Sequence, residues 1–425
     1  MLRTILNAFS VADIRKKLAF TAAMLLLYRL GAYIPAPGVN VAAVKEISSN
    51  FGGAGVLNFL NTFSGGSLSR LSIFALGIMP YITSSIILQL LTVVVPSLER
   101  LQKEGEVGQQ KITQYTRYLT VCLAFFESIG YVFLFRSFGN EANANVVGTL
   151  TFPKVMLIVI SLTAGCTLLM WLGELITQRG IGNGISLMIF ASIASSIPTG
   201  ISKWWNNSDQ VFVVMMPFIA LAVIVAIVFV QEGQRRIPVQ YAKRMVGRKM
   251  TSGGSTYLPL RVNMAGVIPV IFAASIMAFP PTIGQLLNTP AALSFAEFFS
   301  PNSWPYVLGE IFFIIVFTYF YTAVTFNPVD QADNLKKYGG FIPGVRPGRP
   351  TAEFLDRILA RLTFPGALYL AAVAALPTII IASTSAPSSF YFGGTSLLIV
   401  VGVALDTMKQ LEAQLMMRNY EGFLK

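Results

Sequence analysis

Residues Ser64–Thr92 read SGGSLSRLSIFALGIMPYITSSIILQLLT, and this stretch decides the fold. Its second half is apolar enough to cross a bilayer, yet Gly77 and Pro80 interrupt it. In hydrocarbon every backbone N–H and C=O group needs a partner, so broken backbone at membrane depth is tolerated only against protein or water. The apolar segment before it, Val56–Phe63, is too short to span, because a span needs about 20 apolar residues. We therefore predict a short re-entrant segment, a flexible Gly-Gly joint and then a true span.

The composition is typical of a polytopic membrane protein. Of the 425 residues, 54% are hydrophobic and 12% are charged, and the mean hydropathy is +0.65. Soluble domains carry about 25% charged residues. The chain has no histidine, and its two cysteines, Cys122 and Cys166, lie in apolar runs where small core residues are expected. Catalytic triads, Cys-His pairs and histidine metal sites are therefore excluded, and no P-loop occurs. We predict that the chain is not an enzyme and binds no cofactor.

The apolar segments predict an all-α polytopic membrane protein with ten transmembrane helices. Five and five spans suggest two pseudo-symmetric halves, and inverted repeats of this kind are common in channels and transporters. We expect an N-terminal half at 18–200 and a C-terminal half at 201–411, preceded by segment 1–17 and followed by the tail 412–425. The predicted spans are Leu18–Pro35, Leu71–Val95, Tyr115–Phe135, Phe152–Gly173, Asn183–Gly200, Val211–Gln231, Asn263–Pro280, Tyr306–Phe326, Thr363–Ala382 and Thr395–Leu411.

Positive charge indicates the orientation. With ten spans, 25 of the 31 Lys and Arg residues fall on the side of both termini. Because Lys and Arg accumulate in cytoplasmic loops, both termini are expected in the cytoplasm, together with the long loops 232–262 and 327–362. The second loop holds Arg346 in a Pro/Gly-rich turn, VRPGRP, and a rigid mount for one guanidinium favours recognition of a carboxylate or phosphate. Contact with anionic lipids is the other interpretation of these basic loops.

Six motifs resemble the bacterial SecY family and occur in the family's order. The resemblance extends from about Arg15 to the C-terminus. The motifs are SGGSLSRLSIFALGIMPYI at Ser64–Ile82, WLGELITQRGIGNGIS at Trp171–Ser186, GQRRIPVQYAKR at Gly233–Arg244, NMAGVIPVIF at Asn263–Phe272, FNPVDQADNLKKYGGFIPGVRPG at Phe326–Gly348 and FYFGGTSLLIVVGVALD at Phe390–Asp406. The resemblance implies a protein-conducting channel of the general secretory pathway in the bacterial plasma membrane. Such a channel passes unfolded polypeptides and releases signal peptides and membrane segments sideways through a lateral gate.

The resemblance also implies the functional residues. An apolar ring would form the constriction, a plug at about 58–69 would close it from outside, and a lateral gate would lie between the second and seventh spans. The ring residues are Ile78, Ile82, Ile185, Ile189, Ile271 and Ile399, and the plug includes Asn61, Thr62, Phe63, Ser64, Gly65, Gly66 and Ser67. The gate residues are Gln89 and Asn263, and the residues for docking a motor or a ribosome are Arg235, Arg236, Lys243, Arg244 and Arg346. An apolar ring bars ions by dewetting yet makes no specific bond to a passing chain.

The implied partners are the small membrane subunits SecE and SecG, the SecA ATPase motor, the ribosome, signal peptides and unfolded preproteins. Because the chain has no P-loop, the energy for transport must come from one of them. The alternative is a small-solute secondary transporter, which usually needs ionisable residues at mid-depth of the membrane. The candidates for that role are Arg29, Glu127, Glu174 and Glu310, and they are scattered along the sequence without obvious partners.

Overall fold

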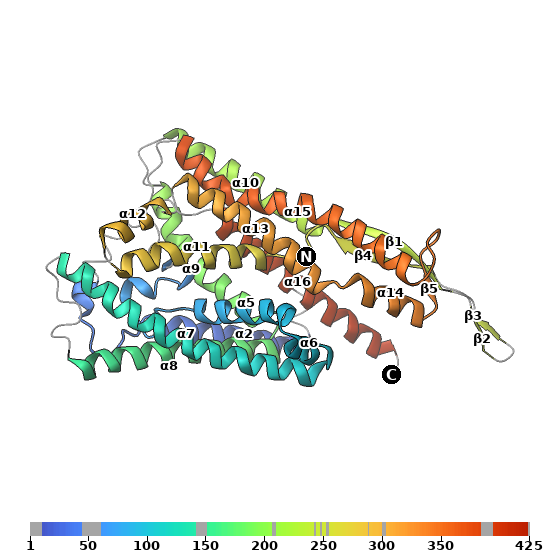
Figure 1. The fold of residues 1–425 in the computed structure, drawn as a ribbon, viewed down its shortest axis with the longest axis horizontal. Helices are drawn as coiled ribbons and strands as arrows, with labels where there is room; N and C mark the ends of the chain where they lie inside the picture. Colours follow the sequence, from blue (N-terminus) through green and yellow to red (C-terminus); the bar gives the residue numbers. More distant parts are fainter. Residues whose placement is uncertain are drawn as a thin grey trace.

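A helix lies at each of the ten predicted spans in the computed structural model (Figure 1). The structure describes residues 11–44, 61–141, 151–205, 210–241, 244–246, 249–251, 255–287, 289–299, 303–383 and 394–423. The helices are α2 (Ala12–Gly31), α5 (Met79–Val94), α7 (Glu106–Glu141), α8 (Phe152–Arg179), α9 (Gly184–Trp205), α10 (Gln210–Glu232), α11 (Ile268–Leu287), α13 (Trp304–Thr325), α15 (Arg349–Ser383) and α16 (Gly394–Phe423). Three shorter helices, α6 (Pro96–Lys103), α12 (Pro290–Phe298) and α14 (Pro328–Lys337), lie between them.

Length and hydropathy alone support a smaller number of spans. Among the described residues, six helical stretches are long and apolar enough to cross a membrane, and they correspond to α7, α8, α9, α10, α13 and α15. A seventh is added if α5 and α6, which meet at 99°, form one broken span. The molecule is therefore a mostly helical, polytopic membrane protein.

The helices pack in two groups that meet along two contacts. In the first group α7 packs on α5 and α8, and α8 packs on α9 and α2. In the second group α13 packs on α11 and α15, and α16 packs on α10 and α15. The groups meet where α11 contacts α5 and α7, and where α16 contacts α9 (Figure 1). A large apolar core cluster draws residues from both groups, so the centre of the molecule lies at this junction.

The second predicted span is helical only from Met79. Pro80 lies in the first turn of α5, a position that proline favours because its missing N–H is not needed there. Gly77, with φ +59°, closes a run of turns over residues 71–78. This run is held to the segment that follows α2 by two backbone hydrogen bonds, from Ala36 N to the Leu71 carbonyl at 2.9 Å and from Ile73 N to the Ile34 carbonyl at 3.0 Å. The expectation of a helix from Leu71 is therefore wrong by about two turns.

The chain is mostly helical, as expected, but the loop 232–262 forms β-structure, which corrects the expectation that the fold is all-α. Strand β1 (Gln234–Tyr241) pairs antiparallel with β4 (Ser255–Arg261), and β5 (Gly340–Phe341) pairs with the far end of β1. The short strands β2 (Arg244–Val246) and β3 (Lys249–Thr251) form a separate antiparallel pair. Ile237 and Val239 alternate with exposed neighbours on β1, the period-two pattern of a half-buried strand.

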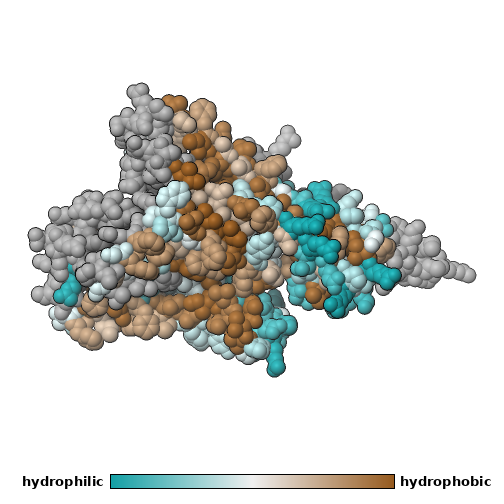
Figure 2. Space-filling model, turned by 45° about the horizontal axis from the view of Figure 1, so that its top comes forward, coloured by the Kyte–Doolittle hydropathy of each residue, from teal (hydrophilic) through white to brown (hydrophobic). Residues whose placement is uncertain are grey.

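The sheet is attached to the helices through its own apolar cluster. Ile237 and Val239 pack with Ile342, which follows β5, and with Leu355 of α15. The two predicted cytoplasmic loops therefore form one packed unit. Figure 2 shows a broad hydrophobic surface over the helices and hydrophilic surface gathered at the end where Figure 1 places β1, β4 and α14.

Candidate functional site

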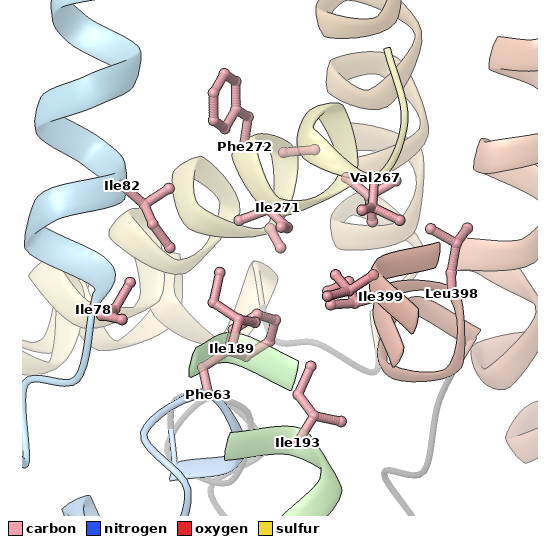
Figure 3. Close-up of a cluster of buried hydrophobic side chains, with 14 of the residues drawn as sticks. Phe63, Ile78, Ile82, Ile189, Ile193, Val267, Ile271, Phe272, Leu398 and Ile399 are labelled. Carbon is pink, nitrogen blue, oxygen red and sulfur yellow. The ribbon is translucent and has the colours of Figure 1, made fainter. Parts of the chain in front are cut away.

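Five of the six predicted ring residues lie in the central apolar cluster. They come from four helices, with Ile78 and Ile82 at the start of α5, Ile189 on α9, Ile271 on α11 and Ile399 on α16, and all five are buried. Figure 3 shows these side chains pointing toward a common centre. Because helical residues four apart share a face, Ile78 and Ile82 both point inward from α5.

The sixth predicted ring residue, Ile185, lies at the edge of this cluster. It is half-buried, and its Cγ1 lies 3.2 Å from where a Cβ on Gly173 of α8 would be. The next turn of α9 instead adds Ile193, which is fully buried and lies with Ile189 and Phe63 in Figure 3. Ile193 could have been predicted from its four-residue spacing to Ile189, which places both on one helix face, but the family motif ends before Ile193.

Phe63 of the predicted plug packs beneath the ring. It is buried in the same cluster as Ile78 and Ile189, and Figure 3 shows its side chain beside Ile189. Residues 58–60 of the predicted plug lie outside the described residues. The plug segment is defined here as residues 61–67.

The plug segment is a compact, internally bonded turn. Gly66 N donates to the Asn61 carbonyl at 2.8 Å, and the Asn61 Oδ1 accepts from Ser69 N at 2.9 Å. Gly65 and Gly66 have φ values of +65° and +82°, a conformation that favours glycine. The turn and the two residues after it thus form a locally hydrogen-bonded unit.

The predicted gate helices lie side by side. α5 packs against α11, and Ser275 of α11 lies 3.9 Å from the Met79 sulfur of α5. Gln89 donates to Ser85 Oγ at 3.3 Å, and Asn263 donates to the Gly266 carbonyl at 2.9 Å, so each amide bonds within its own segment. The side-chain oxygens of both amides are buried without a hydrogen-bond partner in the described part of the chain. Their role in holding a gate stays a prediction.

A cavity of about 440 Å³ lies between the central cluster and the sheet. Its lining includes Val267 and Val403 of the central cluster and the polar Gln231 and Asn263. Charged groups bound its other side, where Lys409 Nζ lies 2.9 Å from Glu232 Oε1 and Arg261 Nη1 lies 4.0 Å from Asp406 Oδ1. A polar mouth thus leads toward an apolar centre.

The structure holds Arg346 in a fixed, exposed turn. Gly344 and Gly348 flank it with φ values of +84° and +102°, and its carbonyl accepts a hydrogen bond from Thr351 Oγ1 at 2.8 Å. Within the described ranges, no side-chain hydrogen bond or ion pair of Arg346 is found. Arg349 differs, because its Nε lies 3.1 Å from Glu353 Oε1.

The other predicted docking residues are less completely described. Arg235 and Arg236 are exposed on β1, beside the strand pairing with β4. Arg244 begins β2, and Lys243 lies outside the described residues. The basic surface near the sheet is therefore present at Arg235, Arg236 and Arg346.

The four ionisable residues considered for a solute transporter do not lie together in one site. Arg29 donates to the Gly65 carbonyl at 2.9 Å, and Glu174 pairs with Arg117 of α7 at 2.7 Å. Glu310 is buried in α13, and Glu127 is half-buried on α7. These four candidates are thus distributed over α2, α7, α8 and α13.

Comparison with known proteins assigns a family. The SecY family model matches residues 72–408. The chain is 49% identical over 445 residues to the protein translocase subunit SecY of Streptomyces coelicolor, covering 100% of both chains. It is 50% identical over 440 residues to the same subunit of Corynebacterium glutamicum, covering 99% of both, and 47% identical over 442 residues to that of Mycobacterium tuberculosis, covering 100% of both.

Solved structures share the fold at lower sequence identity. A structure described as that of a protein conducting channel matches with a TM-score of 0.65 and 19% identity, covering 93% of this chain and 91% of the other. A second, concerned with the plug domain of SecY and the closed state of the channel, matches with a TM-score of 0.63 and 20% identity over the same shares. Sec61 from a canine ribosome-channel complex matches with a TM-score of 0.62 and 19% identity, also over the same shares.

Proposed function

Because the chain belongs to the SecY family, we propose that it is the protein-conducting channel subunit of a protein translocase. It passes unfolded polypeptides across the membrane of a bacterium and is not an enzyme. The observation that supports this most directly is the convergence of isoleucines from α5, α9, α11 and α16 above Phe63 (Figure 3). A small solute would need a specific polar site, whereas an apolar constriction accepts varied side chains.

The proposed topology has ten spans, with both termini in the cytoplasm of a bacterium and the chain in its plasma membrane. Six of these spans are the helices that are long and apolar enough by themselves. The proposal adds α2, α11 and α16 to them, and it counts α5 as a span that ends at the bend before α6. The excess of Lys and Arg on the side of the sheet supports this orientation. The inverted relation of the two five-helix halves belongs to the same proposal.

The proposed channel is closed by two layers. The ring of Ile78, Ile82, Ile185, Ile189, Ile271 and Ile399 excludes water, and the plug segment covers it from the external side. The lateral gate opens between α5 and α11, where signal peptides and membrane segments reach lipid. Gln89 and Asn263 contribute to gate opening. Their side-chain oxygens are buried without a hydrogen-bond partner among the described residues, and each gains a partner when the gate helices rearrange.

The proposed partners follow from the surface near the sheet. Arg235, Arg236, Lys243, Arg244 and Arg346 dock the SecA motor or a ribosome, and SecE and SecG are the small membrane subunits. Anionic lipids contact the remaining basic side chains near the membrane. The support for docking at Arg346 is its fixed turn and the absence of a side-chain partner for it among the described residues.

Reconstitution tests the proposed function. The chain is co-purified in mild detergent with a SecE-like subunit, placed in vesicles and supplied with SecA, ATP and an unfolded preprotein. We expect the preprotein to become protected from added protease only when ATP is present. Vesicles that take up a small solute but protect no polypeptide would contradict the proposal and support the transporter.

A further inference from the structure

We infer that Tyr28 and Arg29, two consecutive residues of the first span, form a hydrogen-bonded latch that holds the plug closed. The inference rests on the proposed function of residues 61–67 as a plug and adds positioning residues to it. It also explains why an arginine lies within a span, where ionisable side chains are costly and usually functional.

The latch grips two consecutive carbonyls of the plug. Arg29 Nη1 donates to the Gly65 carbonyl at 2.9 Å, and Tyr28 Oη donates to the Ser64 carbonyl at 3.3 Å. Tyr28 is 2% exposed and also hydrogen-bonds Ser192 Oγ of α9. The plug is thereby tied to α2 directly and to α9 through Tyr28. Both contacts reach backbone atoms, so they depend on the shape of the turn.

The hydroxyl groups can exchange partners when the plug leaves. Each hydroxyl carries one hydrogen to donate. In the structure the Tyr28 hydroxyl lies within hydrogen-bond distance of both the Ser64 carbonyl and Ser192 Oγ. Ser192 Oγ also lies within hydrogen-bond distance of the Met188 carbonyl, so two hydroxyl hydrogens are shared among three contacts. Without the plug, Tyr28 can donate to Ser192, which in turn donates to the Met188 carbonyl, 2.9 Å from Ser192 Oγ. Release therefore leaves neither buried hydroxyl without a partner, and the latch is reversible.

Arg29 supplies the stronger of the two contacts with the plug. Among the described residues it has no acidic partner. A hydrogen bond from a charged donor is stronger than a neutral one, and the Gly65 carbonyl receives it. The guanidinium also lies 5.7 Å from the centre of the Tyr33 ring, and Arg70, which follows the plug, lies 4.1 Å from the same ring. The plug turn and the segment that follows it are thus both held near the end of α2.

Two adjacent glycines provide a matched pair of variants. A Cβ on Gly65 would lie 2.9 Å from both Arg29 Nη1 and Tyr28 Oη and 3.3 Å from the Cα of Ser192, whereas a Cβ on Gly66 would meet nothing within 4 Å. Both residues have positive φ, so alanine imposes similar backbone strain at either position. Only Gly65→Ala pushes against the latch.

The test measures how often the plug leaves, with a thiol at residue 67 as the probe. Ser67 is fully buried and its Oγ has no hydrogen-bond partner among the described residues, so Ser67→Cys loses no side-chain bond. The background carries Cys122→Ser and Cys166→Ala, and the channel complex is labelled in membranes with an impermeant maleimide from outside. The labelling rate reports the open population when opening is fast relative to labelling.

We expect Tyr28→Phe and Arg29→Gln each to raise the labelling rate by roughly fivefold to tenfold, where tenfold corresponds to about 1.4 kcal/mol. Arg29→Lys should raise it less, because an ammonium still donates to the Gly65 carbonyl. Arg136→Gln, which removes an exposed cation from α7, should leave it unchanged. Gly65→Ala should raise it more than Gly66→Ala.

If Tyr28→Phe and Arg29→Gln both label at the same rate as the parent protein, the inference of a latch is overturned. Equal increases in Gly65→Ala and Gly66→Ala overturn the contact at Gly65, since backbone strain then explains the effect. The glycine pair keeps the inference open to refutation if a Tyr28 or Arg29 variant fails to fold. The assay uses no polypeptide substrate, so failure of transport would reject the proposed function without altering the labelling result.

Discussion

Arg117 of α7 and Glu174 of α8 form a two-pronged ion pair, with 2.8 Å between Nε and Oε1 and 2.7 Å between Nη2 and Oε2. The Glu174 side chain is 12% exposed and the Arg117 side chain is 43% exposed. The carboxylate is therefore the group that loses most when its partner is removed, because little water replaces the guanidinium.

We expect Arg117→Ala to destabilise the purified complex by about 2 kcal/mol, less than the roughly 3–5 kcal/mol for a fully buried pair because Arg117 is partly hydrated. Thermal unfolding in detergent measures this, and a double-mutant cycle with Glu174→Gln isolates the pair. Arg349→Ala is the matched control, because its ion pair with Glu353 is 90% and 62% exposed and should contribute little. Equal shifts in the two alanine variants would show that α7 and α8 do not depend on this ion pair.

The topology predicts that Gly344 faces the cytoplasm. Cysteine at this exposed position, in a chain without Cys122 and Cys166, should not react with an impermeant reagent added to intact cells. Ser202→Cys is the control. Ser202 is exposed near the C-terminal end of α9, which the topology places on the external side, so this cysteine should react. External labelling of the Gly344 variant would reverse the orientation.

The seal predicts an ion leak when the ring becomes polar. Replacing Ile82 and Ile189 with serine introduces hydroxyls that favour water in the constriction, so resting conductance in planar bilayers should rise several-fold. Deleting residues 61–67 should raise it less, because neighbouring residues can form a substitute plug. Serine at Ile160 and Leu168, which are exposed on the apolar helix α8, is the control and should leave conductance unchanged. A parental baseline in the ring variant would count against the seal.

Arg346 should be essential for motor-driven transport. Removing one partner of a buried, charge-assisted hydrogen bond costs on the order of 2–5 kcal/mol, and each 1.4 kcal/mol corresponds to roughly tenfold weaker docking. Arg346→Lys and Arg346→Glu should insert normally and retain resting conductance, yet block transport in vesicles, because an ammonium cannot pair bidentately.

Arg349→Lys is the control for this loop and should be mild, because Arg349 already pairs with Glu353. Near-normal transport by Arg346→Glu would show that Arg346 serves only as a positive charge near the membrane.

The helices could be placed from the sequence because long apolar runs have few alternatives in a membrane. The start of α5 could not be placed in this way. Residues 71–78 are as apolar as the helix itself, and it is the backbone conformation around Gly77 and Pro80 that delays the helix to Met79. The sheet was missed although Ile237 and Val239 alternate with polar neighbours, since the surrounding charge favoured a loop.

The central apolar cluster shows a different limit. Lipid and a dewetted pore favour the same apolar side chains, so spacing alone could not distinguish Ile189, which faces the centre, from Ile160, which is exposed. Only the family resemblance identified the inward face. The contacts of Tyr28 and Arg29 with the plug join residues 36 positions apart, and no local pattern reports them.

The sheet gives the molecule a mechanical linkage. β1 begins two residues after α10 ends, and β4 leads through Asn263 into α11, which carries Ile271 and lies against α5. Pairing from Gln234 to Gln240 joins the two strands into one antiparallel ribbon. This ribbon connects the end of α10 to the start of α11. Because α11 carries Ile271, the sheet and the central apolar cluster are joined through a single helix.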